Sequence, residues 1–352
     1  MNKFLTLIRR DLADNRGALI ITPVVIAAIL LVVTLVASLT GHARFGFDPG
    51  DFSSAREARG TSMSAEIEVG GGNATVNRDA KGRVTVVGPN GEARTLDEAI
   101  NKKTKEGITA VLPIGTAIAS SLPLGIALIA ILFLQAGALH DERKDRTILF
   151  WKSMPVSDLE TVGAKLVSIV GIGLFFALMV GIVLHLAITT IAVLTLNQVG
   201  ITGVTLVPVL ANAVKVWIVV TVGLPFYIGW AMPVYGWFSM VSAWAPKMPF
   251  IAAFAPLVVV PLVYMAIAYR GNDDDKILDA LWDPVGRLIG EPLYDNLGIV
   301  SIKNAKDVPE IPVNEILAHL TQSLTQPMFW VGLVASAGFI YAASEIRRRR
   351  AL

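Results

Sequence analysis

The fold is decided by one uninterrupted apolar stretch, Lys165–Leu196, which reads KLVSIVGIGLFFALMVGIVLHLAITTIAVLTL. After Lys165, the only side chain in it that titrates near neutral pH is that of His185. A membrane-spanning helix needs about 20 mostly apolar residues. This stretch is long enough for a tilted helix, or for one that projects beyond the bilayer. The sequence therefore predicts a helix that crosses a membrane.

The composition of the whole chain agrees with this prediction. Of its 352 residues 54% are hydrophobic and 16% are charged, whereas soluble domains carry roughly 25% charged residues. These values argue against a soluble enzyme and exclude a disordered chain. The absence of cysteine excludes disulfides, thiol nucleophiles and Cys-ligated metals. A net charge of +2 gives no indication of nucleic-acid binding.

Six stretches are long and apolar enough to cross a membrane, and the expected fold class is an all-α polytopic membrane protein. They are Ala18–Thr40, Val111–Leu139, Lys165–Leu196, Val207–Val241, Phe250–Tyr269 and Pro327–Ile346. The first could instead be a signal peptide, but it lacks a clear cleavage site and exceeds the usual apolar core of roughly 7–15 residues.

The basic residues predict that both termini are cytoplasmic. With that orientation, the inside segments carry 13 of the 30 Lys and Arg, among them the terminal run Arg347–Arg350. The short outside loop Asn197–Leu206 carries none. This asymmetry is the one that the positive-inside rule describes. The arginine run serves as a topology anchor, and it could also bind anionic lipid.

Two long outside segments remain. Residues 41–110 contain the alternating runs Ala65–Val69, Ala74–Asn77 and Arg83–Val87 between turn signals, which predict a small β-containing external lobe before a polar helix near Leu96–Lys105. Residues 270–326 are acidic, and Asp273–Asp275 open an amphipathic stretch, Lys276–Ile289. These carboxylates suit a helix N-terminus, although a cation site is an open alternative.

No catalytic constellation is visible. The phosphate loop of an ATPase and the H-E-x-x-H zinc motif are both absent from the sequence. His185 and Lys215 are possible intramembrane polar sites, because burying such groups is costly. The alternatives are a hydrogen bond from His185 to a neighbouring helix, and snorkelling of Lys215 to the interface.

Proline and glycine interrupt several spans. Pro113, Pro123, Pro225, Pro233, Pro256 and Pro261 lie in spans, and Gly223, Gly229 and Gly236 lie in the fourth. Prolines can kink helices or free carbonyl groups. Both residue types are also ordinary components of membrane helices.

The most informative inside segment follows the second span and reads HDERKDRTILFWKSMPVSDLETVGAKL, residues 140–166. His140–Lys152 is expected to continue helically out of that span, and Pro155 then disfavours helix at the residue before it. Ser157 and Glu160 form a capping-box pattern that opens the third span.

This segment resembles the cytoplasmic loop of type-2 ABC exporter permeases, on its Glu142-Arg143 turn, its Phe150-Trp151 pair and its Pro155 break. The turn WFSMVSAWAPKMPF, Trp237–Phe250, resembles the family's turn between the fourth and fifth spans. The N-terminal IRRDLADNRGALIITP resembles its amphipathic entry helix.

The resemblance implies the transmembrane subunit of an ATP-driven exporter in a bacterial cytoplasmic (inner) membrane. It implies a pair of permease subunits, expected to be a homodimer, with two separate ATP-binding subunits that carry ATP and Mg. This chain is then not an enzyme and holds no cofactor or metal of its own, and lipids and an external protein are further expected partners. The implied ATPase-coupling interface comprises Glu142, Arg143, Arg146, Phe150, Trp151, Trp244 and Lys247.

The expected organisation follows from the spans. Residues 1–17 form an interfacial amphipathic helix, 18–40 the first span and 41–110 the external lobe. Residues 111–269 hold spans two to five, with coupling loops near 140–161 and 242–249. Residues 270–326 form the external acidic segment, and 327–352 the last span and basic tail. Two other functions stay open: a subunit that transmits ATP-driven motion to an external partner without transport, and a membrane-embedded enzyme.

Overall fold

A computed structural model describes residues 3–40, 64–69, 72–78, 84–87, 93–100, 102–146, 156–268 and 313–350. The elements between residues 3 and 137 are α1 (Lys3–Asp14), η1 (Gly17–Ile21), α2 (Thr22–Leu39), β1 (Ser64–Val69), β2 (Gly72–Arg78), β3 (Val84–Val87), β4 (Ala93–Thr95), α3 (Leu96–Ala99), α4 (Lys102–Ser120) and α5 (Leu122–Gly137). The remainder are α6 (His140–Lys144), α8 (Asp158–Leu166), η2 (Val167–Ile172), α9 (Gly173–Val199), α10 (Leu206–Trp244), α11 (Pro249–Ala268), α14 (Val313–Ser323) and α15 (Pro327–Arg350).

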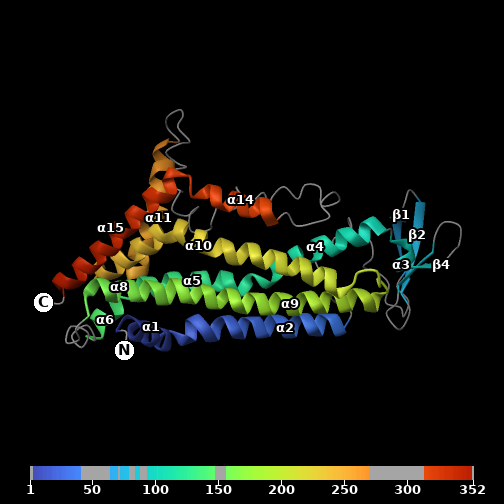
Figure 1. Ribbon diagram of the computed structural model, residues 1–352, viewed down its shortest axis with the longest axis horizontal. Helices are drawn as coiled ribbons and strands as arrows, with labels where there is room; N and C mark the ends of the chain where they lie inside the picture. The colour runs from blue at the N-terminus through green and yellow to red at the C-terminus, as the bar shows by residue number, and fades with distance from the viewer. Residues whose placement is uncertain are drawn as a thin grey trace.

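Long helices run side by side along one axis of the molecule (Figure 1). Both chain termini lie at one end, which we call the terminal end, and β1–β4 lie at the other, the sheet end. In the part of the chain that was searched, five helical stretches are long and apolar enough to cross a membrane: Gly17–Leu39, Thr104–Lys144, Asp158–Val199, Leu206–Trp244 and Pro327–Arg349. This architecture indicates a helical, multi-pass membrane protein.

The described part of each predicted span overlaps helix, that of the fifth span α11. The second is interrupted at Ser121, where Pro123 occupies the first turn of α5. The third begins seven residues before Lys165, because the predicted capping box at Ser157 starts α8 at Asp158. With 39 residues, α10 is about 58 Å long and exceeds a hydrocarbon core of about 30 Å.

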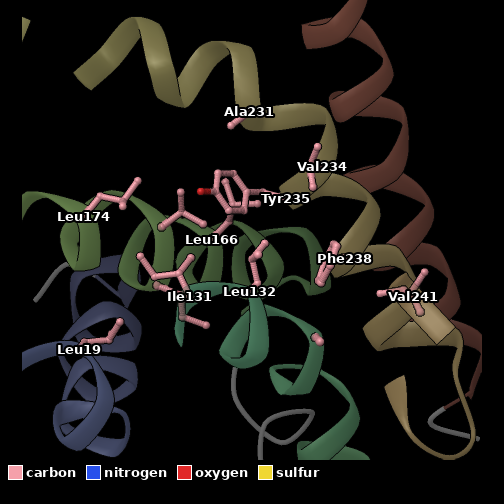
Figure 2. Packing of buried hydrophobic residues seen from close by; sticks show 14 of the residues in the cluster. Leu19, Ile131, Leu132, Leu166, Leu174, Ala231, Val234, Tyr235, Phe238 and Val241 are labelled. Carbon is pink, nitrogen blue, oxygen red and sulfur yellow. The ribbon is translucent and has the colours of Figure 1, made fainter. Parts of the chain in front are cut away.

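The main core lies where η1, α5, α8, η2, α9, α10 and α11 meet, and Figure 2 shows most of its residues. Tyr235 and Phe238 of α10 point toward Ile131 and Leu132 of α5 and toward Leu166 at the end of α8. Aromatic rings continue this core toward α11, since the ring of Phe133 stacks on that of Phe250 at 3.8 Å and 7°. These contacts hold α5, α10 and α11 together near the terminal end.

The longest helix, α10, packs in parallel with α15 at small residues spaced seven apart. A Cβ on Gly229 would meet the ring of Phe329, and a Cβ on Gly236 would meet the backbone of Ser336. One further heptad along, Ala243 and Ala343 share a buried cluster. Small residues let helix backbones approach closely in membranes, so the glycines of the predicted fourth span have a packing role here.

Two π-helical segments contact one core near the terminal end. In η1, Leu19 packs with Ile169 and Val170 of η2. Its Cδ2 lies 2.8 Å from the place where a Cβ of Gly173 would be. π-Helical turns are rare and occur frequently at functional sites.

The strands form an antiparallel sheet of order β1-β2-β3-β4. β1, β2 and β3 overlap the three alternating runs, whereas β4 is only three residues long and carries no such signal. The sheet end is fastened to the turn between α9 and α10, because the Asp97 carboxylate accepts a hydrogen bond from the Gly203 N–H at 2.9 Å and pairs with Lys105, also at 2.9 Å. These bonds lower the pKa of the Asp97 carboxyl, the Lys105 hydrogen bond most of all.

The expectation of one unbroken helix from His140 to Lys152 is wrong, because the chain leaves the helix after Lys144; residues 147–152 lie outside the described residues. α6 ends at Lys144, and Arg146 has a positive φ of 55°, which an α-helix does not accommodate. The amphipathic stretch Lys276–Ile289 and the acidic run Asp273–Asp275 lie outside the described residues. A helix that the sequence did not predict, α14, packs its Leu320 against Trp230 and Phe329.

Candidate functional site

Two loops at the terminal end are joined by one arginine. The first loop is the connection between α6 and α8, of which residues 145–146 and 156–157 are described and residues 147–155 are not. The second is residues 245–248, between α10 and α11. From α6, Nη2 of Arg143 donates to the carbonyl oxygens of Ser242 and Ala245, each at 2.8 Å. The last carbonyls of a helix have no partner within it. A cation placed there stabilises the helix C-terminus, so Arg143 both caps α10 and fixes the start of the first loop to it.

Ser242 makes the reciprocal connection. Its Oγ accepts hydrogen bonds from the backbone N–H groups of Leu139, at 2.9 Å, and His140, at 3.2 Å. These N–H groups begin α6, so the side chain acts as a cap from another helix. The first turn of α6 and the last turn of α10 are thus held as one unit.

Each of the two loops also contains a left-handed residue. Within the described residues, Arg146 (φ 55°) and Met248 (φ 47°) are the non-glycine residues with positive φ. Such residues are uncommon in proteins and recur at functional sites. This is a second feature that the two loops share.

A largely buried network of charges lies between α1, α6, α8 and α15; we call it the ion network. It comprises Asp11 of α1, Glu142 of α6, Asp158 and Lys165 of α8, and Arg347 of α15. Glu142 is at its centre: Oε1 lies 3.1 Å from Lys165 Nζ, and Oε2 accepts from Arg347 Nη2 at 2.9 Å. Arg347 also donates from Nη1 to Asp158 Oδ1 at 3.0 Å.

The members of this network are largely withdrawn from solvent. The side chain of Arg347 is 3% exposed and that of Glu142 is 12% exposed. Removing one partner of a buried pair leaves an uncompensated charge, which is strongly destabilising. The network therefore ties α1, α6, α8 and α15 together near the terminal end.

Asp11 joins α1 to this network. Its Oδ1 lies 3.4 Å from Lys165 Nζ, and its Oδ2 accepts from the Ser168 hydroxyl at 3.4 Å. Burial raises the pKa of the Asp11 carboxyl above its ordinary value, the Lys165 ammonium opposes that shift, and the Glu142 carboxylate adds to it. η1 begins six residues after Asp11 and η2 begins two residues after Lys165, so the network lies beside both π-helical segments.

The predicted coupling residues divide into two groups. Arg146, Trp244 and Lys247 are exposed at the terminal end, whereas Glu142 and Arg143 point inward and hold helices together. Phe150 and Trp151 lie outside the described residues. The sequence did not predict Arg347 as a partner of Glu142; its place at the end of an apolar span was the only available signal.

His185, the first of the two intramembrane candidates, is completely buried between three helices. Trp217 Nε1 donates to His185 Nδ1 at 2.5 Å, so Nδ1 is an acceptor. The proton is then on Nε2, which donates to the Pro113 carbonyl at 2.8 Å and lies 3.0 Å from Thr116 Oγ1. The ring is thus a neutral imidazole that joins α4, α9 and α10. This agrees with the alternative given in the sequence analysis, a hydrogen bond from His185 to a neighbouring helix.

Pro113 has a second consequence in this region. It lies inside α4 and has no N–H for the carbonyl of Thr109, four residues earlier. Asn212 of α10 donates to that carbonyl at 3.2 Å. Lys215 lies half-buried on α10, two residues before Trp217, and residues two apart on a helix do not face the same way. The structure therefore does not place Lys215 on the face that meets His185.

The described residues contain no group of three or more His, Asp or Glu arranged to hold a metal ion. Comparison with family models, with curated proteins and with solved structures finds no match to this chain.

Proposed function

We propose that this chain is the transmembrane permease subunit of an ATP-driven exporter, and that the terminal end is its cytoplasmic face. The observation that carries the proposal is the double fixing of the two loops by Arg143 and Ser242. Because of it, the start of the first segment that resembles a coupling loop, at α6, and the start of the second, at the end of α10, are held as one unit. A motor subunit that pushed on this unit would move α6 and α10 together.

The contact surface for the ATP-binding subunit is formed by the exposed residues of these loops. Arg146 and Lys247 offer cations, Trp244 and Met248 offer apolar area, and the last two side chains are 53% and 69% exposed. Glu142 and Arg143 support this surface from behind. In this proposal the subunits pair in the bilayer of a bacterial cytoplasmic membrane, with both termini inside, and α11 is the fifth of six spans.

The experiment is a pull-down in mild detergent followed by ATPase assays. The wild-type chain is expected to recover an ATP-binding subunit and to alter its rate of hydrolysis. The contact variant Trp244→Ala/Lys247→Glu is expected to lose that subunit, whereas Arg348→Ala, which changes an exposed residue on α15 at the same end, is expected to retain it. Failure to recover any ATP-binding subunit with the wild-type chain would refute the proposal.

A second function has one observation in its favour. Asp97 fastens α3, beside the sheet, to the turn between α9 and α10, so movement of these helices would reach the sheet directly. In this alternative, ATP-driven motion acts on an external partner and nothing is transported. Stimulation of the ATPase by a lipid, peptide or drug would favour the exporter; stimulation only by an external protein would favour the transmitter.

A further inference from the structure

α1 packs on the bundle with one side only. On that side Leu7 and Ile8 are buried in a cluster with Ala164 of α8, and Asp11 reaches the ion network. The other side of the helix is exposed along most of its length. The side chains on this second side decide what it meets.

Three residues form a stripe along the exposed side of α1: Arg9, Leu12 and Arg16. Their spacing of three and four residues places them on one face of a helix. The helix does not end between them, because the Asn15 N–H donates to the Asp11 carbonyl at 3.0 Å and Arg16 has helical φ and ψ of −53° and −34°. Both arginines are exposed, with Leu12 half-buried between them.

The two arginines are available to a ligand. Within the part of the chain that the structure describes, neither Arg9 nor Arg16 makes a hydrogen bond or an ion pair. Asp14, an exposed acid of the same helix, is instead paired with Arg10 at 3.4 Å. A guanidinium presents a planar fork of donors that matches a phosphate group. The stripe is therefore a surface of unneutralised cations suited to phosphate.

The stripe ends where an apolar face begins. Arg16 directly precedes η1, and the helix continues into α2 without a charged residue from Gly17 to Leu39. Figure 1 shows α1 leading into α2 at the terminal end. Two turns after Arg16, Val24 and Val25 are 44% and 48% exposed. A phospholipid has the same order of parts, a phosphate followed by apolar chains, whereas a soluble anion or an acidic protein has no use for the apolar face.

We propose that Arg9 and Arg16 bind the phosphate headgroup of an anionic phospholipid whose acyl chains lie along α2. In this arrangement α1 is held from two sides, by the ion network on one and by lipid on the other. Only the assignment of this lipid to the cytoplasmic leaflet rests on the proposed function. The binding itself depends on this chain alone.

The experiment uses the full chain by itself in a mild neutral detergent. It is titrated with phosphatidylglycerol or with phosphatidylcholine, and the lipids retained on the protein are counted by native mass spectrometry. A cation beside anionic lipid contributes about fivefold in affinity. Arg9→Gln/Arg16→Gln is therefore expected to lower the apparent affinity for phosphatidylglycerol about 30-fold and to leave that for phosphatidylcholine unchanged. Arg9→Lys/Arg16→Lys, which keeps the charge but loses the fork, is expected to fall between this variant and wild type.

The matched control removes two other arginines from the same end. Arg348→Gln/Arg349→Gln changes exposed residues that already pair with Glu345, and it is expected to bind phosphatidylglycerol as wild type does. Equal losses in the two glutamine variants would show that only the overall charge of the terminal end matters, and would overturn the site. Equal affinities of the wild-type chain for the two lipids would overturn it as well.

A further arm separates lipid from free phosphate. Glycerol phosphate, which has the headgroup chemistry without acyl chains, is expected not to displace phosphatidylglycerol; full displacement would identify a site for soluble anions and contradict the proposal. Because Arg9 and Arg16 are exposed, their replacement leaves no buried charge uncompensated, and circular dichroism is expected to show wild-type helix content in both variants of this pair. No ATP-binding subunit is present in these measurements, so their result stands whether the pull-down described above succeeds or fails.

Discussion

Replacing Gly236 tests the parallel contact between α10 and α15. A Cβ at this position would lie 2.9 Å from Ser336 Oγ and 3.2 Å from both Cα and the carbonyl oxygen of Ser336. Ordinary contacts begin near 3.4 Å. The Oγ can rotate away only by giving up its hydrogen bond to Met232, and the backbone atoms cannot rotate at all. α15 must therefore withdraw by a few tenths of an ångström.

The cost follows from this geometry. Overpacking a filled interior costs typically about 1–3 kcal/mol, so Gly236→Ala is expected near the lower figure and Gly236→Val near the upper one. The matched control is Gly223 on the same helix, where a Cβ would meet only Leu320 Cδ1 at 3.8 Å. Any gain in helix propensity on replacing glycine, about 1 kcal/mol for alanine, is common to both positions and cancels in the difference.

The assay is equilibrium unfolding in mixed detergent micelles, followed by far-UV circular dichroism. The free energy of unfolding of Gly236→Val is expected to fall about 2–3 kcal/mol below that of Gly223→Val. Ser336→Gly combined with Gly236→Ala should recover part of the loss, because the closest contact is then gone. Equal stabilities of the two valine variants, within about 0.5 kcal/mol, would refute the close approach of these helices.

Three further predictions follow from the site. His185→Phe leaves the Trp217 N–H buried without its acceptor and should cost about 1–3 kcal/mol of unfolding free energy; adding Trp217→Phe should recover much of it. Ser157→Ala removes the capping box with Glu160 and should cost about 0.5–2 kcal/mol, whereas Ser157→Thr should not. The folded-state pKa of Asp11 is raised from 3.8 by burial. The folded state therefore binds that proton more tightly, and stability relative to Asp11→Asn should fall as pH rises from about 3.8 through the folded pKa; a flat difference between the two titrations would contradict this.

The spans could be predicted from the sequence because the bilayer imposes a requirement that residues meet locally. A run of about 20 apolar residues indicates a span, and the Ser157–Glu160 pair indicates a helix start; both can be recognised without any knowledge of distant contacts. The strand positions of β1 to β3 were visible for the same reason, since alternation has its own period.

The inward role of Glu142 could not be predicted in that way. Its charge and its place after an apolar span suit an exposed contact as well as a buried ion pair. The side chain turns inward because it pairs with Arg347, which is 205 residues away in the sequence. The same applies to His185, whose acceptor and donor partners lie 72 and 32 residues away. The prolines and glycines in the spans were a partial signal for contacts between helices. Pro113 does free a carbonyl group and Gly236 does allow close packing, but the sequence does not show which helix makes each contact.

The π-helical segments η1 and η2 have a consequence for the length of the chain. Bonds from i to i+5 enclose one more residue in a turn than the α-helical bonds from i to i+4. Deleting one residue from Gly17–Ile21 or Val167–Ile172 would let α-helical bonds close again and keep the flanking faces in phase. The same deletion in the middle of α2 or α9 would rotate everything beyond it by about 100°. These two segments of the described chain are therefore expected to tolerate the loss of one residue.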